Sequence, residues 1–209
     1  MQIQNNKEEV PFAYYEARFR SLVPEEAARR CGVEFSGGCF SVTLLGVRYH
    51  IRWPEYAISA DTENAFALSN LPCQTFLLRF LLEGKKALPS AGFRTFREMP
   101  WGEMYITPYT GRCLTRSAFA FGRKIGEFSN ACEEMGAQRI AHGDAGYLFE
   151  FLGGYRMQIM IYEADEEFPP SSQILYSGNF ADGFAAEDRV VAGDILISAI
   201  QAVMKRSKK

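Results

Sequence analysis

Apolar positions recur at alternating spacings of four and three residues through the segment 112–135. This spacing puts about one apolar side chain per turn on a single helical face, so it predicts a buried helical stripe. The stripe consists of Leu114, Ala118, Phe121, Ile125, Phe128, Cys132 and Met135. Gly122 and Gly126 lie inside it, and each costs a helix about 1 kcal/mol relative to alanine. The pattern therefore predicts either one long helix or two helices.

Prolines, glycines and terminal charges mark further helices. Residues 7–31 predict two helices, because Pro24 opens the second one and acidic residues follow it in the first turn. Residues 71–83 are preceded by an asparagine and followed by a glycine, which predicts a capped helix. The segment 186–206 carries acids first and lysines last, as the helix dipole favours, and its polar stripe predicts that Asp194 is solvated.

Alternating β-branched and aromatic residues predict the strands. Residues 39–45 and 47–53 flank Gly46 and predict a hairpin. Later apolar runs separated by glycines predict an antiparallel meander of three or four strands, which lie within 138–142, 146–155, 156–164 and 172–177. Helices packed on one face of a mostly antiparallel sheet predict an α+β fold, and the length predicts a single domain over 1–209.

The composition narrows the function classes. The formal net charge of the 209 residues is -2, so the chain lacks the excess positive charge that nucleic-acid binding requires. The N-terminal segment has no apolar signal-peptide core, and the run FLLRFLL is too short to span a bilayer. We therefore expect a cytoplasmic protein with no nucleic-acid or membrane partner. The five cysteines fit neither a disulfide framework nor a zinc site, so reduced thiols are expected.

Four acidic residues follow a strongly apolar run. In a strand through 157–165, alternate side chains share a face, which predicts that Glu163 and Asp165 lie about 7 Å apart and point into a shared cleft. There they could flank a cation or a substrate. Glu166 and Glu167 are expected to face solvent or to cap the backbone. The alternatives are a solvated turn, or neutralisation of the acids by Arg112, Arg116 and Arg123.

A histidine and an aspartate occupy the turn before the second strand of the meander. His142 and Asp144 could orient a proton donor or join a metal shell. His50 is the only other histidine, which excludes a multi-histidine metal site. Asp144 is equally explained as a turn-forming residue. Glu163 and Asp165 are therefore only weak candidates as metal ligands.

Aromatic and arginine side chains are interleaved between 92 and 112. Prolines and glycines punctuate the segment, which predicts an ordered loop. Guanidinium groups among rings can hold a flat carboxylated or phosphorylated ligand, and they can equally fasten a long connection to the core. The candidate ligand-binding residues are Arg94, Arg97, Trp101 and Tyr105.

Four short motifs resemble an uncharacterised family of bacterial and archaeal proteins, known as a domain of unknown function. In chain order they are TFREMPWGEMY, HGDAGYLFEF, ADEEFPPSSQILYS and AAEDRVVAGDIL. Some members of that family are fused to iron-sulfur-cluster modules. The resemblance implies no established activity or cofactor, but it implies an anaerobic setting and a redox or corrinoid protein partner.

These features support three hypotheses. The leading one is a non-catalytic small-ligand-binding or accessory module in anaerobic redox or corrinoid-linked metabolism, in which the aromatic loop and the acidic turn border one pocket. The second is a metal-dependent enzyme that uses the carboxylate cluster, with His142 as acid or base. The third is a purely structural interaction domain. No cofactor or oligomeric state follows from the sequence.

Overall fold

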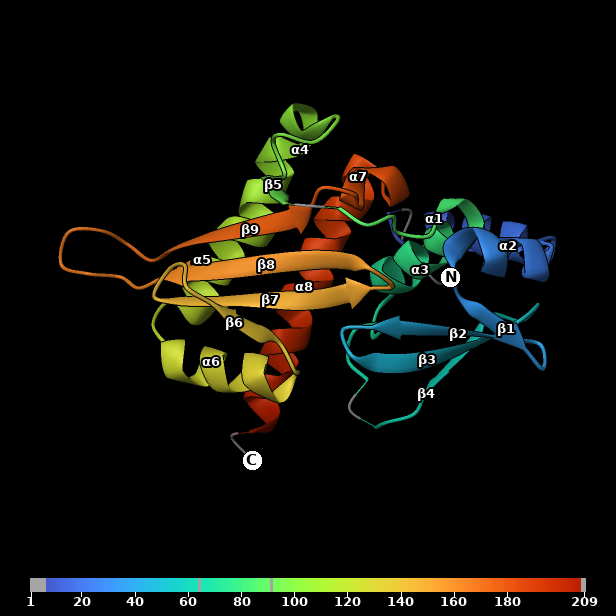
Figure 1. Ribbon diagram of the computed structural model, residues 1–209, viewed down its shortest axis with the longest axis horizontal. Coiled ribbons are helices and arrows are strands. Elements are labelled where there is room, and N and C mark those ends of the chain that lie inside the picture. The colour runs from blue at the N-terminus through green and yellow to red at the C-terminus, as the bar shows by residue number, and fades with distance from the viewer. Residues whose placement is uncertain (1–6, 64, 91, 208–209) are drawn as a thin grey trace, which may run out of the picture.

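A nine-stranded antiparallel sheet organises the chain, which the computed structural model describes over residues 7–63, 65–90 and 92–207. The hydrogen-bonded order is β4-β3-β2-β7-β8-β9-β5, with β1 beside β2 and β6 beside β7. Figure 1 shows helices behind the central strands of this sheet. The predicted α+β fold is confirmed. The first six residues, in which the sequence predicts no signal peptide, lie outside the described part.

The N-terminal elements form one end of the molecule. They are α1 (Glu9–Arg20), α2 (Pro24–Cys31), β1 (Glu34–Ser36), β2 (Cys39–Leu44), β3 (Val47–Arg52), β4 (Ala57–Ala60) and α3 (Leu71–Glu83). Pro24 lies in the first turn of α2, and Gly32 ends that helix with a φ of 69°, a conformation that glycine adopts readily. The β2–β3 turn places Leu45 and Gly46 at φ 49° and 78°, which matches the twist of a tight hairpin. The predicted helix pair, hairpin and third helix are confirmed.

Closely spaced helical segments occupy the middle of the chain. This part contains β5 (Phe93–Thr95), α4 (Gly102–Tyr109), a π-helical segment (Thr110–Thr115), α5 (Arg116–Phe121) and α6 (Ile125–Glu134). The predicted loop over 92–112 is therefore wrong in its second half, which is helical. Pro108 lies inside α4, and the hydrogen-bond pattern widens to the π type directly after this turn. Of the two alternatives for 112–135, the structure shows separate helices with a break at Gly122.

The C-terminal part supplies the central strands and the longest described helix. Its elements are β6 (Gln138–Ile140), β7 (Ala145–Leu152), β8 (Tyr155–Tyr162), β9 (Ser171–Ser177), α7 (Phe180–Gly183) and α8 (Ala186–Arg206). The predicted meander and final helix are confirmed, although β8 ends before the acidic residues. In the described residues, Leu44 and Leu152 form the one register pair between β2 and β7. The two parts of the sheet therefore join through a narrow bridge.

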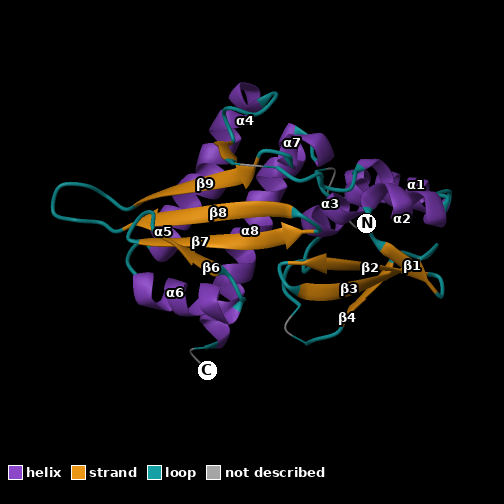
Figure 2. Ribbon diagram, viewed as in Figure 1, coloured by secondary structure: helices purple, strands orange, loops and turns teal. Residues whose placement is uncertain are grey.

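Helix α8 runs along the sheet and forms the centre of the core (Figure 2). It packs against α3, α6 and the π-helical segment. Asp194 on this helix is not solvated as predicted: Arg112 and Arg116 pair with it, and its side chain is only 17% exposed. The cause is that the neighbouring helical run lies against the polar stripe of α8 and covers it. Neither α8 nor any other described helix has the length and apolar character that a membrane crossing requires.

Candidate functional site

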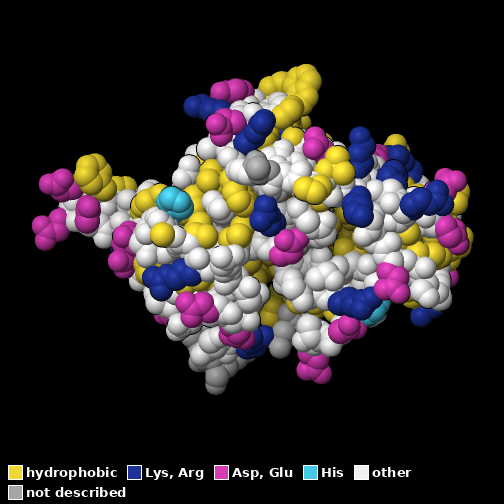
Figure 3. Space-filling model, viewed as in Figure 1, with side chains coloured by type: hydrophobic (Ala, Val, Ile, Leu, Met, Phe, Trp, Pro, Cys, Tyr) yellow, Lys and Arg dark blue, Asp and Glu magenta, His cyan; other side chains and the backbone are white. Residues whose placement is uncertain are grey.

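The acidic turn, which contains Glu163, Asp165, Glu166 and Glu167, lies in the β8–β9 loop. This loop projects from the sheet (Figures 1 and 3). Because β8 ends at the residue before Glu163, the strand alternation that would point Glu163 and Asp165 into a shared cleft does not reach them. Both side chains are exposed, as are Glu166 and Glu167. The Asp165 carboxylate accepts the backbone N–H groups of Glu167 and Phe168 at 2.9 and 2.7 Å. Glu166 and Glu167 thus face solvent, the first of the two alternatives predicted for them, and Asp165 is the residue that caps the backbone.

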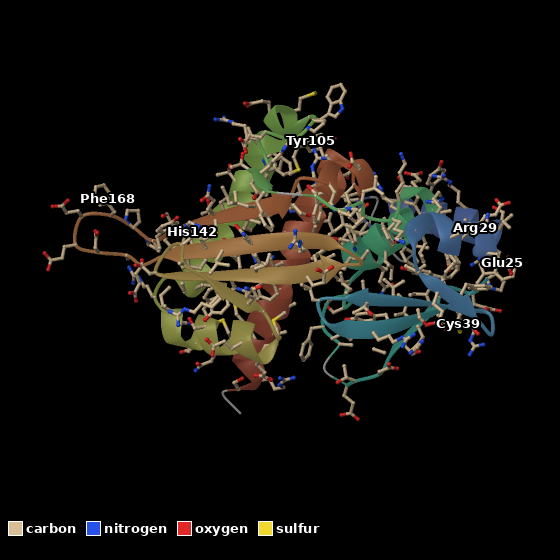
Figure 4. The ribbon with its side chains drawn as sticks, viewed as in Figure 1. Glu25, Arg29, Cys39, Tyr105, His142 and Phe168 are labelled. Carbon is tan, nitrogen blue, oxygen red and sulfur yellow. The ribbon has the colours of Figure 1, made fainter. Side chains whose placement is uncertain are left out.

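Asp144 fastens the same loop to the end of β8. Its carboxylate accepts the backbone N–H of Glu163 at 2.7 Å, and its own N–H donates to the Ile161 carbonyl at 3.0 Å. His142 is exposed at this end of the molecule (Figure 4). The described residues contain no group of three His, Cys, Asp or Glu side chains that could hold a metal ion. The Asp144 side chain thus contacts only the backbone of Glu163, and the two carboxylates do not form a set of metal ligands.

Of the three arginines considered as neutralising partners of the acidic turn, Arg112 and Arg116 pair with Asp194 on α8, and Arg123 is exposed without an ion pair among the described residues. Arg116 has its Nη1 3.4 Å from Asp194 Oδ1, and its Nη2 donates to Ser198 and Gln201 at 2.9 and 2.7 Å. Arg112 pairs with the same aspartate. The carboxylates of the turn form no ion pair with the cationic side chains described. Exposure to solvent is what weakens their mutual repulsion, as in the solvated-turn alternative.

The predicted arginines of the aromatic segment lie at the surface. Arg94 is exposed on β5, and Arg97 pairs with Glu103 at 3.0 Å while both side chains stay more than half exposed. Arg97 also borders a shallow pocket of about 330 Å³ between α4 and β9. The acidic turn contributes no residue to that pocket, and Figure 4 shows Tyr105 and Phe168 at distant points of the molecule. The aromatic segment and the acidic turn therefore do not border one pocket, contrary to the leading hypothesis.

Trp101 is held at the start of α4 in a strained backbone conformation. Its φ of 62° lies in the left-handed region, which costs a bulky residue energy. Gly102 allows the close turn, because a Cβ there would lie 2.1 Å from the Phe96 carbonyl oxygen. The Trp101 side chain is 71% exposed, and Tyr105 in the next turn is 37% exposed. The fold thus holds the large Trp101 side chain in contact with solvent, at the cost of a strained backbone conformation.

Arg189 on α8 is a deeply buried cation, with only 2% of its surface exposed. Its Nη1 donates to the Phe184 carbonyl at 2.9 Å, its Nη2 donates to the Pro100 carbonyl, and the guanidinium lies 5.7 Å from the ring centroid of Phe96. Its Nε has no hydrogen-bond partner, and no described carboxylate pairs with it. Burial lowers the Arg189 pKa, with partial compensation from nearby groups. The guanidinium fastens the aromatic segment to α8, and its positive charge is only partly compensated.

Asp188 and Arg79 form a buried ion pair beside it. Arg79 Nε lies 3.0 Å from Asp188 Oδ1, with the side chains 17% and 10% exposed, although the N–H is not aligned for a hydrogen bond. Burial raises the Asp188 pKa to about 6 against the opposing attraction of Arg79. Burial lowers the Arg79 pKa, but attraction by Asp188 and other nearby groups outweighs this, so the pKa is raised. Asp188 can therefore change its protonation near neutral pH.

These residues border one cleft of about 430 Å³, which we name the α8 cleft. It lies between the end of α3, the start of α4, α7 and the first turn of α8. Its charged lining residues are Arg79, Glu83, Lys85, Asp182, Asp188 and Arg189. A carboxyl with a perturbed pKa, a buried cation and a strained aromatic residue at one cleft are features of functional sites. The α8 cleft is therefore the candidate site.

Of the residues that line this cleft, the sequence predicted Trp101 as a ligand-binding candidate but none of the charged residues. The available signal was the position of Arg189, which shares a helical face with Gly193 and Ile200. Both of these are buried. An arginine on an otherwise apolar helical stripe needs a partner in the fold, and this need was the detectable feature.

Comparison with known protein families assigns the chain to one of them. A family model described as Domain of unknown function (DUF3786) matches residues 23–199. The chain belongs to the DUF3786 family. No curated protein sequence and no solved structure matches it. The matched part of this DUF3786 chain includes every charged residue of the α8 cleft, and the family description assigns no activity.

Proposed function

We propose that this DUF3786 protein is a small-ligand-binding module whose ligand occupies the α8 cleft. The observation that carries the proposal is the buried guanidinium of Arg189, which has one N–H without an acceptor and no carboxylate partner among the described residues. Burying a charge without its partner costs several kcal/mol. The carbonyl oxygens of Phe184 and Pro100 accept hydrogen bonds from its Nη atoms, but these oxygens carry only partial negative charge. The retained charge is explained by a ligand that complements it.

The shape of the cleft supports the same proposal. Its volume of about 430 Å³ fits a small molecule. Trp101 borders it and offers a flat apolar face that the fold holds in a strained conformation. The metal-dependent alternative finds no set of ligand side chains among the described residues. The anaerobic redox or corrinoid-linked setting and the cytoplasmic location rest on the sequence alone and stay predictions.

A ligand screen with two matched variants tests the proposal. Thermal-shift and tryptophan-fluorescence measurements on the full chain would identify stabilising metabolites, and Kd would be measured for each. Trp101→Ala should weaken binding about tenfold or more, because it removes an aromatic wall. Met104→Ala is the control, since Met104 is also 71% exposed on α4 but does not border the cleft. Compounds that bind Trp101→Ala as tightly as Met104→Ala would place the ligand outside the α8 cleft and refute the proposal.

A further inference from the structure

The three cations and three carboxylates that line the α8 cleft are unequally engaged in ion pairs. Arg18 Nη1 lies 2.6 Å from Glu83 Oε1, and Arg79 pairs with Asp188. The charged residues of the cleft that form no ion pair within the described part of the chain are Lys85, Asp182 and Arg189. The lining charges sum to zero, but two cations and one carboxylate remain without an ion pair, and both cations are available to a ligand charge.

The first turn of α8 adds partial positive charge to the cleft. This helix has 21 residues, and its N-cap, Ala185, has no side-chain oxygen that could accept the first N–H groups. The Asp188 carboxylate accepts the Ala185 N–H at 3.2 Å and is otherwise engaged by Arg79. Glu187 does not border this cleft and pairs with Arg79 at 3.3 Å. N–H groups at such a terminus bind carboxylate and phosphate oxygens.

Arg189 is an independent reason to expect an anion here. It is almost completely buried, it borders the cleft, and its Nε lacks a partner. Two carbonyl oxygens already hold its Nη atoms, so it acts on a ligand through its charge and not by direct contact. The field of a cation in a partly dehydrated site is weakly screened, which favours an anion nearby.

We infer that the ligand is a small organic anion with a single carboxylate or phosphate group. Lys85 and the first-turn N–H groups of α8 hold that group, and Trp101 packs against a flat apolar portion of the molecule. The inference rests on the proposed function and adds the chemical class of its ligand.

Matched aromatic probes test the charge requirement on the full chain. Benzoate and benzamide have nearly the same shape, but only benzoate is charged, and phenyl phosphate distinguishes phosphate from carboxylate recognition. By calorimetric or NMR titration, benzoate or phenyl phosphate should bind at least about tenfold more tightly than benzamide, because hydrogen bonds to an anion are the stronger ones. Benzamide binding as tightly as both anions, or no binding of either anion, would overturn the inference.

Two neighbouring lysines give the matched variants. Lys85→Ala should raise the Kd of the anions about tenfold and leave that of benzamide unchanged. Lys86→Ala should change neither, since Lys86 is exposed but does not border the cleft. Both lysines are exposed, so neither replacement removes a buried side chain and both variants should fold. Equal effects of the two lysine variants would contradict the anion assignment.

The two proposals fail in different ways. Neutral compounds that bind with a requirement for Trp101, and with none for Lys85, would retain the ligand-binding proposal and overturn the anion inference. Compounds whose binding does not depend on Trp101 would overturn the ligand-binding proposal itself.

Discussion

Replacing Asp188 with asparagine should alter how the stability of this protein depends on pH. Burial raises the pKa of this carboxyl from 3.8 to about 6, although Arg79 opposes the shift. Because folding raises the pKa, the folded protein binds the proton more tightly than the unfolded chain does. The contribution of Asp188 to stability is therefore fully present below the unfolded value and is lost as the pH rises through 6. At about 1.4 kcal/mol per pH unit, the loss amounts to about 3 kcal/mol.

The assay is urea unfolding followed by circular dichroism, for the wild type and Asp188→Asn, from about pH 4 to about pH 7. Other carboxyl groups titrate in this range, so the informative quantity is the difference in unfolding free energy between the two proteins. At the lowest pH the wild-type carboxyl is protonated and, like the asparagine of the variant, gives Arg79 no charged partner, so the two proteins differ least there. The stability of the wild type should therefore gain up to about 3 kcal/mol relative to the variant as the pH falls.

Asp182→Asn provides the control for this experiment. Asp182 borders the same cleft but is exposed, so its replacement should leave the pH dependence of stability nearly unchanged. A difference between the wild type and Asp188→Asn that stays constant with pH would refute the argument from burial. A wild type that loses stability relative to the variant at low pH would show that attraction by Arg79 outweighs burial at the carboxylate.

Three other predictions follow from local geometry. Gly122→Ala should lower the unfolding free energy by about 1–3 kcal/mol, since its Cβ would lie 2.4 Å from Pro170 Cβ, whereas Gly126→Ala meets open space and should raise it by about 0.5–1 kcal/mol. Iodoacetamide should modify Cys39 alone in the native protein, because the other four cysteines are buried; mass spectrometry showing equal labelling of a buried thiol would contradict this. Asp165→Ala should cost about 1–2 kcal/mol by removing two hydrogen bonds, and a magnesium-dependent rise in Tm that this variant abolishes would instead support a metal site.

Long elements were predictable because their patterns repeat, and short ones were not. The stripe along 112–135 and the terminal charges of the last helix carry several turns of information. In contrast, β1, β4 and β5 contain three or four residues each, too few to show alternation. The helix α4 contains Pro108 and begins after Trp101, in a stretch whose prolines and glycines are typical of a loop. Its packing against α8 overrides these local preferences.

The end of β8 illustrates a different limit. Alternation of side chains continues in any extended chain, whereas a strand ends where its hydrogen-bonded partner ends. The last register pair between β8 and β9 is Tyr162 with Ser171, and the proline before Ser171 cannot donate a backbone hydrogen bond. The faces assigned to Glu163 and Asp165 therefore depended on a pairing that the sequence of one strand does not contain.

The candidate site shows why an unpaired charge is harder to detect than a patterned one. Asp188 and Arg189 are adjacent in the chain, but on a helix adjacent side chains point in different directions, so attraction by Asp188 offsets only part of the burial that lowers the Arg189 pKa. The carboxylate turns toward Arg79 on α3, while Arg189 points to the carbonyl groups of Phe184 and Pro100. From the sequence, the charges of this acid and this base cancel. The three-dimensional assignment of partners shows instead that Asp188 pairs with Arg79, whereas Arg189 forms no ion pair among the described residues.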